Sequence, residues 1–129
     1  MYKVDHFING KSSSESNKTS KIYNPSYGTE IGEVLCATNE VADKAVESAY
    51  EASKAWSKTG LIYRSELILK FRQNVINRSK EIIDLGISEA GKTRPDAEAE
   101  LDRAVQALTH IAGVQHFYPS HYSQKLRLP

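Results

Sequence analysis

The hydrophobic period of the chain changes at Thr38, and this change constrains the fold more than any other feature. Before this residue, apolar and polar residues alternate in short runs, as in strands, where successive side chains point to opposite faces. After it, apolar residues recur about every 3.6 positions, as in amphipathic helices. The sequence therefore predicts a β-rich segment over residues 1–37, a helical layer over 38–118 and a tail over 119–129.

Short strands and turns are predicted for the first segment. Phe7-Ile8 leads into Asn9-Gly10, a dipeptide typical of tight hairpins because both of its residues tolerate positive φ. The Ser-rich tract over 11–21 is expected to be a mobile loop, and Ile22-Tyr23 a second short strand. Residues 30–35 alternate in polarity, which indicates a half-buried strand.

Four helices are predicted after this segment. Thr38 or Asn39 caps the first, which ends near Trp56 and carries an Ala-rich stripe on one face. The residues of that stripe are Ala42, Ala45, Val46, Ala49, Ala52 and Trp56. Gly60 separates the first helix from the second, whose apolar residues are Leu67, Ile68, Phe71 and Val75.

The third helix is predicted over 80–89, with Ser79 as its cap and Gly91 beyond its end. Thr93 and Asp96, with Pro95 between them, resemble a capping box and mark the start of the fourth helix. Its apolar residues recur at helical spacing, and we expect it to run out near residues 117–119. They are Ala97, Leu101, Ala104, Val105, Leu108, Ile111 and Ala112.

Each of these helices has one apolar face, which must be buried against another helix or a sheet. The predicted strands are short and lie at one end of the chain, which stops at Leu126–Pro129 without a capping element. Two interpretations stay equally open at this point: the helices form a self-contained bundle, or the sheet that they would cover is missing. The abrupt end of the chain favours a fragment.

Composition excludes several classes of function. With 17 Lys and Arg against 16 Asp and Glu, the net charge of +1 gives no basic surface for nucleic acid. The longest stretch without charged residues, 104–124, contains too many His, Gln and Pro residues to span a membrane. The first residues lack the apolar core of a secretory signal, and the single Cys36 cannot form an internal disulfide. A cytoplasmic location is expected.

One motif points to nucleotide binding. Residues 86–93, GISEAGKT, match the phosphate-binding loop G-x-x-x-x-G-K-[ST], in which Lys92 would reach the phosphates and Thr93 a magnesium ion. However, the preceding residues follow a helical rather than a strand period, and Pro95 comes where a long helix should be under way. A turn between two helices is the favoured interpretation, and a small nucleotide-binding module is kept as the alternative.

Other reactive side chains do not form a recognisable site. His110, His116 and His121 are spaced by six and five residues, so they do not share a helical face, and His6 is distant. Cys36 follows a predicted strand without a partner that would activate a thiol, and is interpreted as a small buried residue. No metal site is predicted.

The order of features resembles the N-terminal portion of the aldehyde dehydrogenase superfamily. The matching pieces are Phe7–Lys11, Tyr23-Asn24-Pro25 with Gly28, Ile31–Val34, Ala55-Trp56-Ser57, Arg64 and Glu89–Thr93 leading to Asp96-Ala97. The resemblance extends to about Gly113. It also accounts for the match to the phosphate-binding loop at residues 86–93, since such enzymes carry E-x-G-K at the junction between these two helices with no phosphate there.

The resemblance implies an α/β fold, of which this chain holds a short β entry and four helices while the central Rossmann-like sheet is largely missing. It also implies an oxidation of aldehydes to acids or acyl-CoA with NAD or NADP. In that family a cysteine thiolate attacks the aldehyde, hydride passes to the nicotinamide, and a glutamate serves as base in hydrolytic members. These groups follow later in the family's chains, so Cys36 does not correspond to the nucleophile, and no cofactor is expected to bind this chain alone. Self-association or a homo-oligomer is expected.

The resemblance also singles out one substrate-binding residue. Glu100–Arg103 is similar to the segment of methylmalonate-semialdehyde dehydrogenases whose arginine holds the substrate carboxylate, which makes Arg103 the candidate. Ala90, Ala99 and Ala104 depart from that pattern, and succinate-semialdehyde-type enzymes are an equal possibility. We expect the chain to be inactive in isolation. A non-catalytic helical interaction module is a further alternative.

Overall fold

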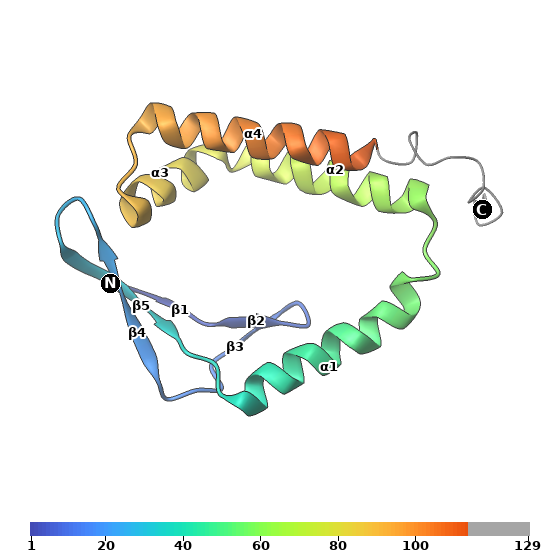
Figure 1. Ribbon diagram of the computed structural model, residues 1–129, viewed down its shortest axis with the longest axis horizontal. Helices are drawn as coiled ribbons and strands as arrows, with labels where there is room; N and C mark the ends of the chain where they lie inside the picture. Colours follow the sequence, from blue (N-terminus) through green and yellow to red (C-terminus); the bar gives the residue numbers. More distant parts are fainter. Residues whose placement is uncertain (114–129) are drawn as a thin grey trace. The chain divides into compact units, whose positions relative to one another are not determined.

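The computed structural model describes residues 1–113, in which five short strands precede four helices (Figure 1). The strands are β1 (Tyr2–Val4), β2 (His6–Ile8), β3 (Lys11–Ser13), β4 (Thr19–Asn24) and β5 (Thr29–Leu35). The helices are α1 (Asn39–Trp56), α2 (Leu61–Asn77), α3 (Ser79–Ala90) and α4 (Arg94–Ala112). The expected order of strands before helices is confirmed.

The chain divides into two compact units. The first unit contains residues 1–58 together with the short segment Glu89–Gly91. The second contains residues 59–88 and the chain from Lys92 onward.

The first unit is built on a three-stranded mixed sheet with the order β1-β5-β4. β1 runs parallel to β5, with Tyr2 opposite Gly32, and β4 runs antiparallel to β5 with an irregularity between Ile22 and Tyr23. The strand predicted over 30–35 is confirmed as part of β5, and Ile22-Tyr23 lies in β4. β1 was not predicted, because three residues are too few to establish a period.

A separate hairpin joins β2 to β3. Asn9 and Gly10 form its turn with φ of 53° and 74°, so both residues adopt the left-handed conformation that the sequence predicted. The prediction of a loop over 11–21 was wrong at both ends of the tract. Lys11–Ser13 pairs with β2, and β4 begins at Thr19, so serine-rich composition was overridden by strand pairing.

α1 begins as predicted, because the Thr38 side chain accepts a hydrogen bond from the backbone of Val41 at 3.3 Å. Val41 and Leu35, each 5% exposed, are the buried apolar residues of this unit. The predicted stripe does not form a buried seam. Val46 on that stripe is 69% exposed, and Ala42 and Ala49 are also exposed. The first unit therefore leaves most of the apolar surface of α1 uncovered.

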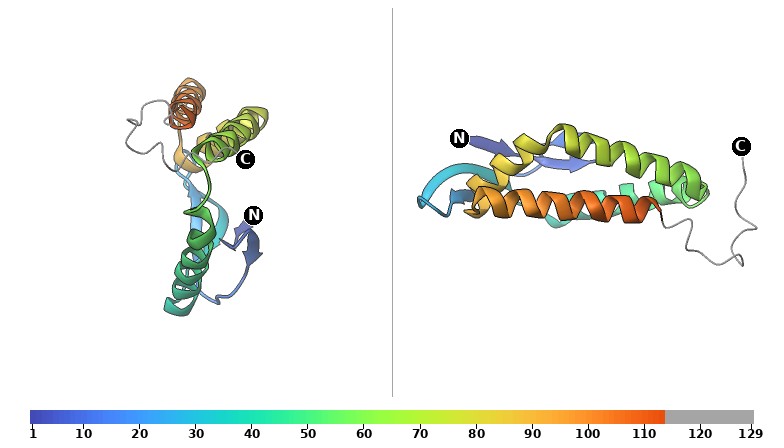
Figure 2. Two further views of the ribbon diagram at one scale, coloured as in Figure 1. Left: turned by 90° about the vertical axis from the view of Figure 1, so that its right-hand side faces the viewer. Right: turned by 90° about the horizontal axis from the view of Figure 1, so that it is seen from above.

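In the second unit, α2 and α4 run antiparallel side by side (Figures 1 and 2). Ala97 and Ala112, each 6% exposed, are its buried residues, and Arg72 Nε on α2 donates to Thr109 Oγ1 on α4 at 2.8 Å. α4 ends at Ala112 rather than near residues 117–119. Gly113 closes it by donating to the Thr109 and His110 carbonyls, and glycine disfavours further helix.

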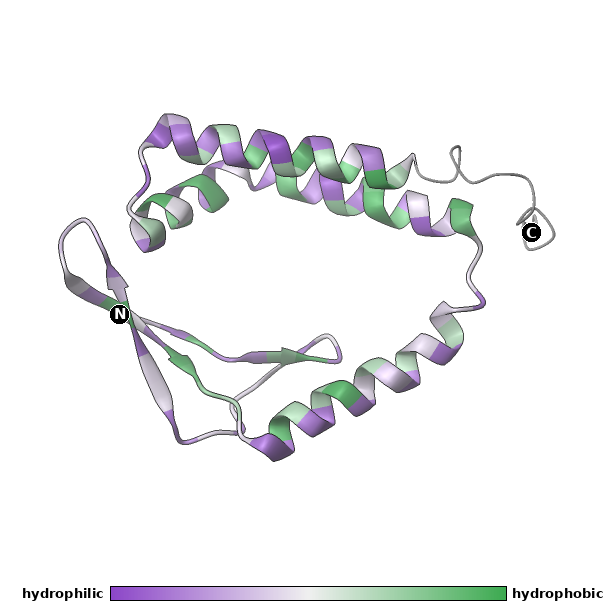
Figure 3. Cartoon of the chain, viewed as in Figure 1, coloured by the Kyte–Doolittle hydropathy of each residue, from purple (hydrophilic) through white to green (hydrophobic). Residues whose placement is uncertain are grey.

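Both units are thinly packed. Among the described residues, the buried apolar side chains are Leu35, Val41, Ala97 and Ala112, and no side chain is completely buried. Hydrophobic and hydrophilic residues alternate along the ribbons of the helices (Figure 3). None of the helices in residues 1–113 is both long and apolar enough to cross a membrane. The predicted tail over 119–129 lies outside the described residues.

Candidate functional site

The junction between α3 and α4 is a helix-to-helix turn, so the phosphate-loop alternative was wrong. Gly86 lies inside α3, where a phosphate loop would need an open backbone, and Gly91 ends the helix with a φ of 65°. Residues 87–90 of the motif thus belong to the last turn of α3 and not to an open loop whose amides could surround a phosphate group.

Lys92 and Thr93 serve the start of α4 instead of a nucleotide. Lys92 forms an ion pair with Glu100, and Thr93 caps the helix by accepting from the Asp96 amide at 3.3 Å. The Thr93 hydroxyl also donates to the Asp96 carboxylate at 2.6 Å. The capping pair expected from the sequence is therefore confirmed, with Asp96 in the place of the usual Glu.

Arg103 lies on α4, one turn after Glu100. Its Nη2 atom is 4.0 Å from Glu100 Oε1, and its side chain is 68% exposed. Glu100 is engaged mainly by Lys92, whose hydrogen bond and charge hold the pKa of that carboxyl below its ordinary value. Since Lys92 compensates Glu100, the Arg103 guanidinium keeps a solvent-facing set of donors that matches the geometry of a carboxylate.

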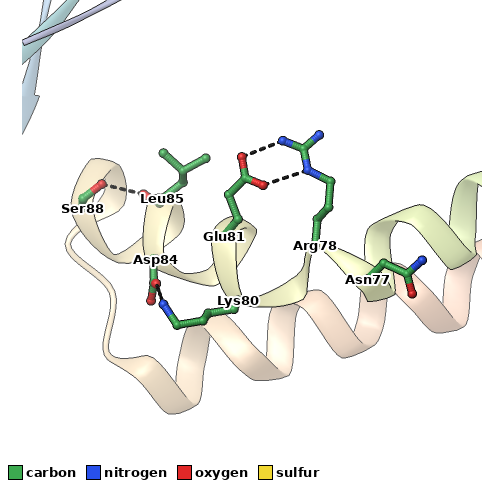
Figure 4. A pocket seen from close by; sticks show the side chains of 7 residues that line it. All are labelled: Asn77, Arg78, Lys80, Glu81, Asp84, Leu85 and Ser88. Atoms are coloured by element: carbon green, nitrogen blue, oxygen red, sulfur yellow. Dashed lines mark hydrogen bonds and ion pairs between the residues drawn. The ribbon is translucent and has the colours of Figure 1, made fainter.

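A shallow groove follows the start of α3 and is lined mostly by charged residues (Figure 4). Arg78 forms two hydrogen bonds with Glu81, at 2.8 and 2.6 Å. Asp84 accepts from Lys80 at 2.8 Å and from Arg94 at 2.7 Å, and these bonds lower its pKa. Because its charges are paired with one another, the groove offers no poised acid, base or nucleophile.

Cysteine and histidine do not gather into a reactive cluster within residues 1–113, and no group of three or more metal-ligating side chains is found there. Cys36 is half-buried, and its carbonyl accepts from the Ser16 hydroxyl at 2.6 Å. His6 lies in β2 and His110 in the last turn of α4. His116 and His121 lie outside the described residues.

The described residues do not fit a dinucleotide. Such a cofactor needs a glycine-rich turn between a strand and a helix, where backbone amides meet the pyrophosphate. The connection from β5 to α1 is Cys36-Ala37-Thr38, which contains no glycine. Gly32 is also closed to a ligand, because a Cβ there would lie 2.5 Å from the Tyr2 carbonyl oxygen.

Sequence reasoning missed one cluster in the first unit. The Tyr2 hydroxyl donates to Glu89, which raises the pKa of Tyr2, and Gly91 lies against Pro25. Glu89 and Gly91 both belong to the motif Glu89–Thr93, which the sequence did single out. The sequence does not show, however, that this motif contacts Tyr2 and Pro25, because these residues are far from it along the chain.

Comparison with known proteins identifies the fold. The family model described as "Aldehyde dehydrogenase family" matches residues 12–125. The mouse mitochondrial methylmalonate-semialdehyde/malonate-semialdehyde dehydrogenase (acylating) is 37% identical over 112 residues, which are 86% of this chain and 21% of that protein.

Solved structures agree with the sequence comparison. Methylmalonate-semialdehyde dehydrogenase from Oceanimonas doudoroffii has a TM-score of 0.86 at 25% identity, over 90% of this chain and 24% of that one. The NAD-dependent benzaldehyde dehydrogenase from Corynebacterium glutamicum has a TM-score of 0.82 at 28% identity, over 86% and 24%.

The chain spans about a fifth of the length of the curated relatives that it matches. The matched relatives and the strand-then-helix order agree on the same N-terminal portion of the fold. Since the family model covers most of its residues, the chain belongs to the aldehyde dehydrogenase family.

Proposed function

We propose that this chain forms the N-terminal portion of a dehydrogenase that oxidises a carboxylate-bearing semialdehyde with NAD or NADP. Family membership and the likeness to the mouse methylmalonate/malonate-semialdehyde enzyme support this substrate class. A succinate semialdehyde would present the same carboxylate at a different distance from the aldehyde.

Arg103 is the residue proposed to bind the substrate carboxylate. The observation that carries this proposal is its 68% exposed guanidinium beside a Glu100 already paired with Lys92. A guanidinium binds a carboxylate through two parallel hydrogen bonds, which orients the aldehyde as well as holding it. The residues present would therefore position the substrate, and the cofactor would supply the hydride acceptor in the complete enzyme.

A chimera tests this role. The matching 112-residue segment of the mouse enzyme is replaced by this chain, and kinetics are measured with malonate semialdehyde and with propanal, which lacks the carboxylate. Arg103→Ala should raise KM for malonate semialdehyde about tenfold or more, since a hydrogen bond to a charged group contributes about 1.5–3 kcal/mol. KM for propanal should stay unchanged.

Arg78→Ala is the matched control, because Arg78 is an exposed arginine engaged by Glu81. It should leave both KM values unchanged. An equal effect of Arg103→Ala on both aldehydes, or no effect on either, would contradict the proposed contact with the carboxylate.

The isolated 129-residue chain is proposed to be inactive. Incubation with NAD or NADP and a panel of semialdehydes should yield no reduced cofactor, because the reacting groups of the family come from later residues. Sustained turnover would overturn this view.

We further propose that the chain acts in the cytoplasm and self-associates when alone. Uncovered apolar surface forfeits roughly 25 cal/mol per Å² of burial, which favours association. Light scattering should show a mass that rises with concentration.

A further inference from the structure

Lys92 and Arg103 are both cationic neighbours of Glu100. Lys92 forms a hydrogen-bonded ion pair with the Oε2 atom of this carboxylate, whereas the Arg103 Nη2 atom lies 4.0 Å from its Oε1 atom. The second separation is too long for a hydrogen bond. The hydrogen bond of the Glu100 carboxylate therefore goes to Lys92 and not to Arg103.

The start of α4 places Lys92 where it can reach Glu100. Lys92 directly precedes Thr93, which caps the helix by accepting from the Asp96 amide. Thr93 and Glu100 are seven residues apart, so they lie two turns from each other on one face of α4. The long Lys92 side chain spans this distance and is only 31% exposed, against 68% for Arg103.

Glu100 is also the carboxylate on α4 that is best placed to compete with a substrate for Arg103. Residues three and four positions apart are neighbours on a helix surface, and for Arg103 these are Ala99, Glu100, Gln106 and Ala107. Of these four neighbours, only Glu100 is charged. Without Lys92, Glu100 would be drawn to Arg103, because opposite charges at this spacing attract each other on a helix.

We propose that Lys92 is a positioning residue that selects for carboxylate-bearing aldehydes: by holding Glu100, it keeps the Arg103 guanidinium available to the substrate. This inference rests on the proposed function of Arg103. Lys92 acts through Glu100 and needs no contact with the substrate. Its loss would turn Glu100 into an internal competitor, because a side-chain carboxylate and a substrate carboxylate use the same N–H donors of the guanidinium.

The chimera with the mouse enzyme tests this role by kinetics. Lys92→Met should raise KM for malonate semialdehyde about threefold, as expected for a change in an exposed charge pair. It should leave kcat and KM for propanal unchanged, because only a substrate with a carboxylate competes with Glu100. Lys92→Arg should behave like the wild type. Lys80→Met is the matched control, because Asp84 keeps its bond to Arg94, and it should change neither KM.

Two double variants show whether Lys92 acts through the other two residues. Lys92→Met combined with Glu100→Gln should restore the wild-type KM for malonate semialdehyde, because the competitor is then uncharged. In the Arg103→Ala background, Lys92→Met should have no further effect on this KM, since the group that it frees is absent. A Lys92→Met effect that persists in either double variant would overturn the inference.

An NMR titration of Glu100 in the 129-residue chain tests the exchange of partners without a substrate. In the wild type, Arg103→Ala should change the pKa of Glu100 little, because Lys92 is the main cause of its lowering. In the Lys92→Met background, the same substitution should raise that pKa distinctly more, because Arg103 has then become the partner. Equal shifts in the two backgrounds would contradict the exchange.

The inference and the proposed function fail in different ways. If Arg103→Ala raises KM for malonate semialdehyde alone but Lys92→Met has no effect, the role of Lys92 is refuted and the role of Arg103 stands. If Arg103→Ala affects neither aldehyde, the proposed function is refuted and the selection by Lys92 with it.

Discussion

Gly91 lies so close to Pro25 that a Cβ on the glycine would come within 2.9 Å of Pro25 Cγ. Its φ of 65° is also a conformation that other residues adopt at a cost of roughly 1–2 kcal/mol. Glycine at this position therefore lets the segment Glu89–Gly91 pack in the first unit without strain or a clash.

The first prediction follows from this contact and uses a pair of glycines. Gly91→Ala should lower the free energy of unfolding by about 2 kcal/mol, from backbone strain and the clash with Pro25. Gly86→Ala should instead raise it by about 0.5–1 kcal/mol, because a Cβ at this α3 position meets nothing within 4 Å and alanine favours helix. Urea titration of both variants measures the change in the free energy of unfolding relative to the wild type. Changes of the same sign in the two variants would contradict the described junction between α3 and α4.

The second prediction concerns the pairing of β1 with β5. Gly32→Ala would place a Cβ 2.5 Å from the Tyr2 carbonyl oxygen, a backbone atom that moves only if β1 moves. We expect amide exchange in Tyr2–Val4 to accelerate about tenfold or more, since an edge strand of three residues opens locally. Ser20→Ala in β4 is the control and should leave β1 protected.

The third prediction concerns pH. Lys92 holds the pKa of Glu100 below its ordinary value of 4.5, so Lys92→Met should return that pKa toward 4.5 in an NMR titration. The sign follows from the lowered pKa. The ion pair stabilises the folded chain when the pH is above the pKa that Glu100 has in the unfolded chain. This stabilisation is lost as the pH falls through the lower pKa that Glu100 has in the folded chain. Lys54→Met removes the partner of Glu51 on α1 and should leave the Glu100 titration unchanged.

The fourth prediction concerns nucleotides. A fluorescent ATP analogue with magnesium should show no saturable binding to the chain, because Lys92 pairs with Glu100 and Thr93 caps α4. Lys92→Ala should not change the fluorescence. Micromolar binding that this substitution abolishes would restore the phosphate-loop alternative.

Local signals in the sequence predicted local structure well. Asn9-Gly10 predicted the hairpin turn, and Thr38 and Thr93 predicted the starts of α1 and α4, because each signal acts within a few residues. The position of Arg103 on α4 also followed from periodicity, while its carboxylate-binding role stays a prediction.

Features that depend on distant partners could not be predicted in this way. β1 is defined by pairing with residues 30 positions later in the chain, and Glu89 by its bond to Tyr2. The stripe of α1 was identified as apolar, but burial needs a facing surface, and Val46 has none in the first unit. Periodicity shows which side of a helix is apolar and not what covers it.

The discontinuous first unit has a consequence for synthesis on the ribosome. Met1–Lys58 emerges early, but Glu89–Gly91 joins the same unit only after the whole of α2 has been made. Folding of this unit is thus completed only after α2 has been synthesised, and the nascent strands wait for a short segment that is encoded well downstream of α1.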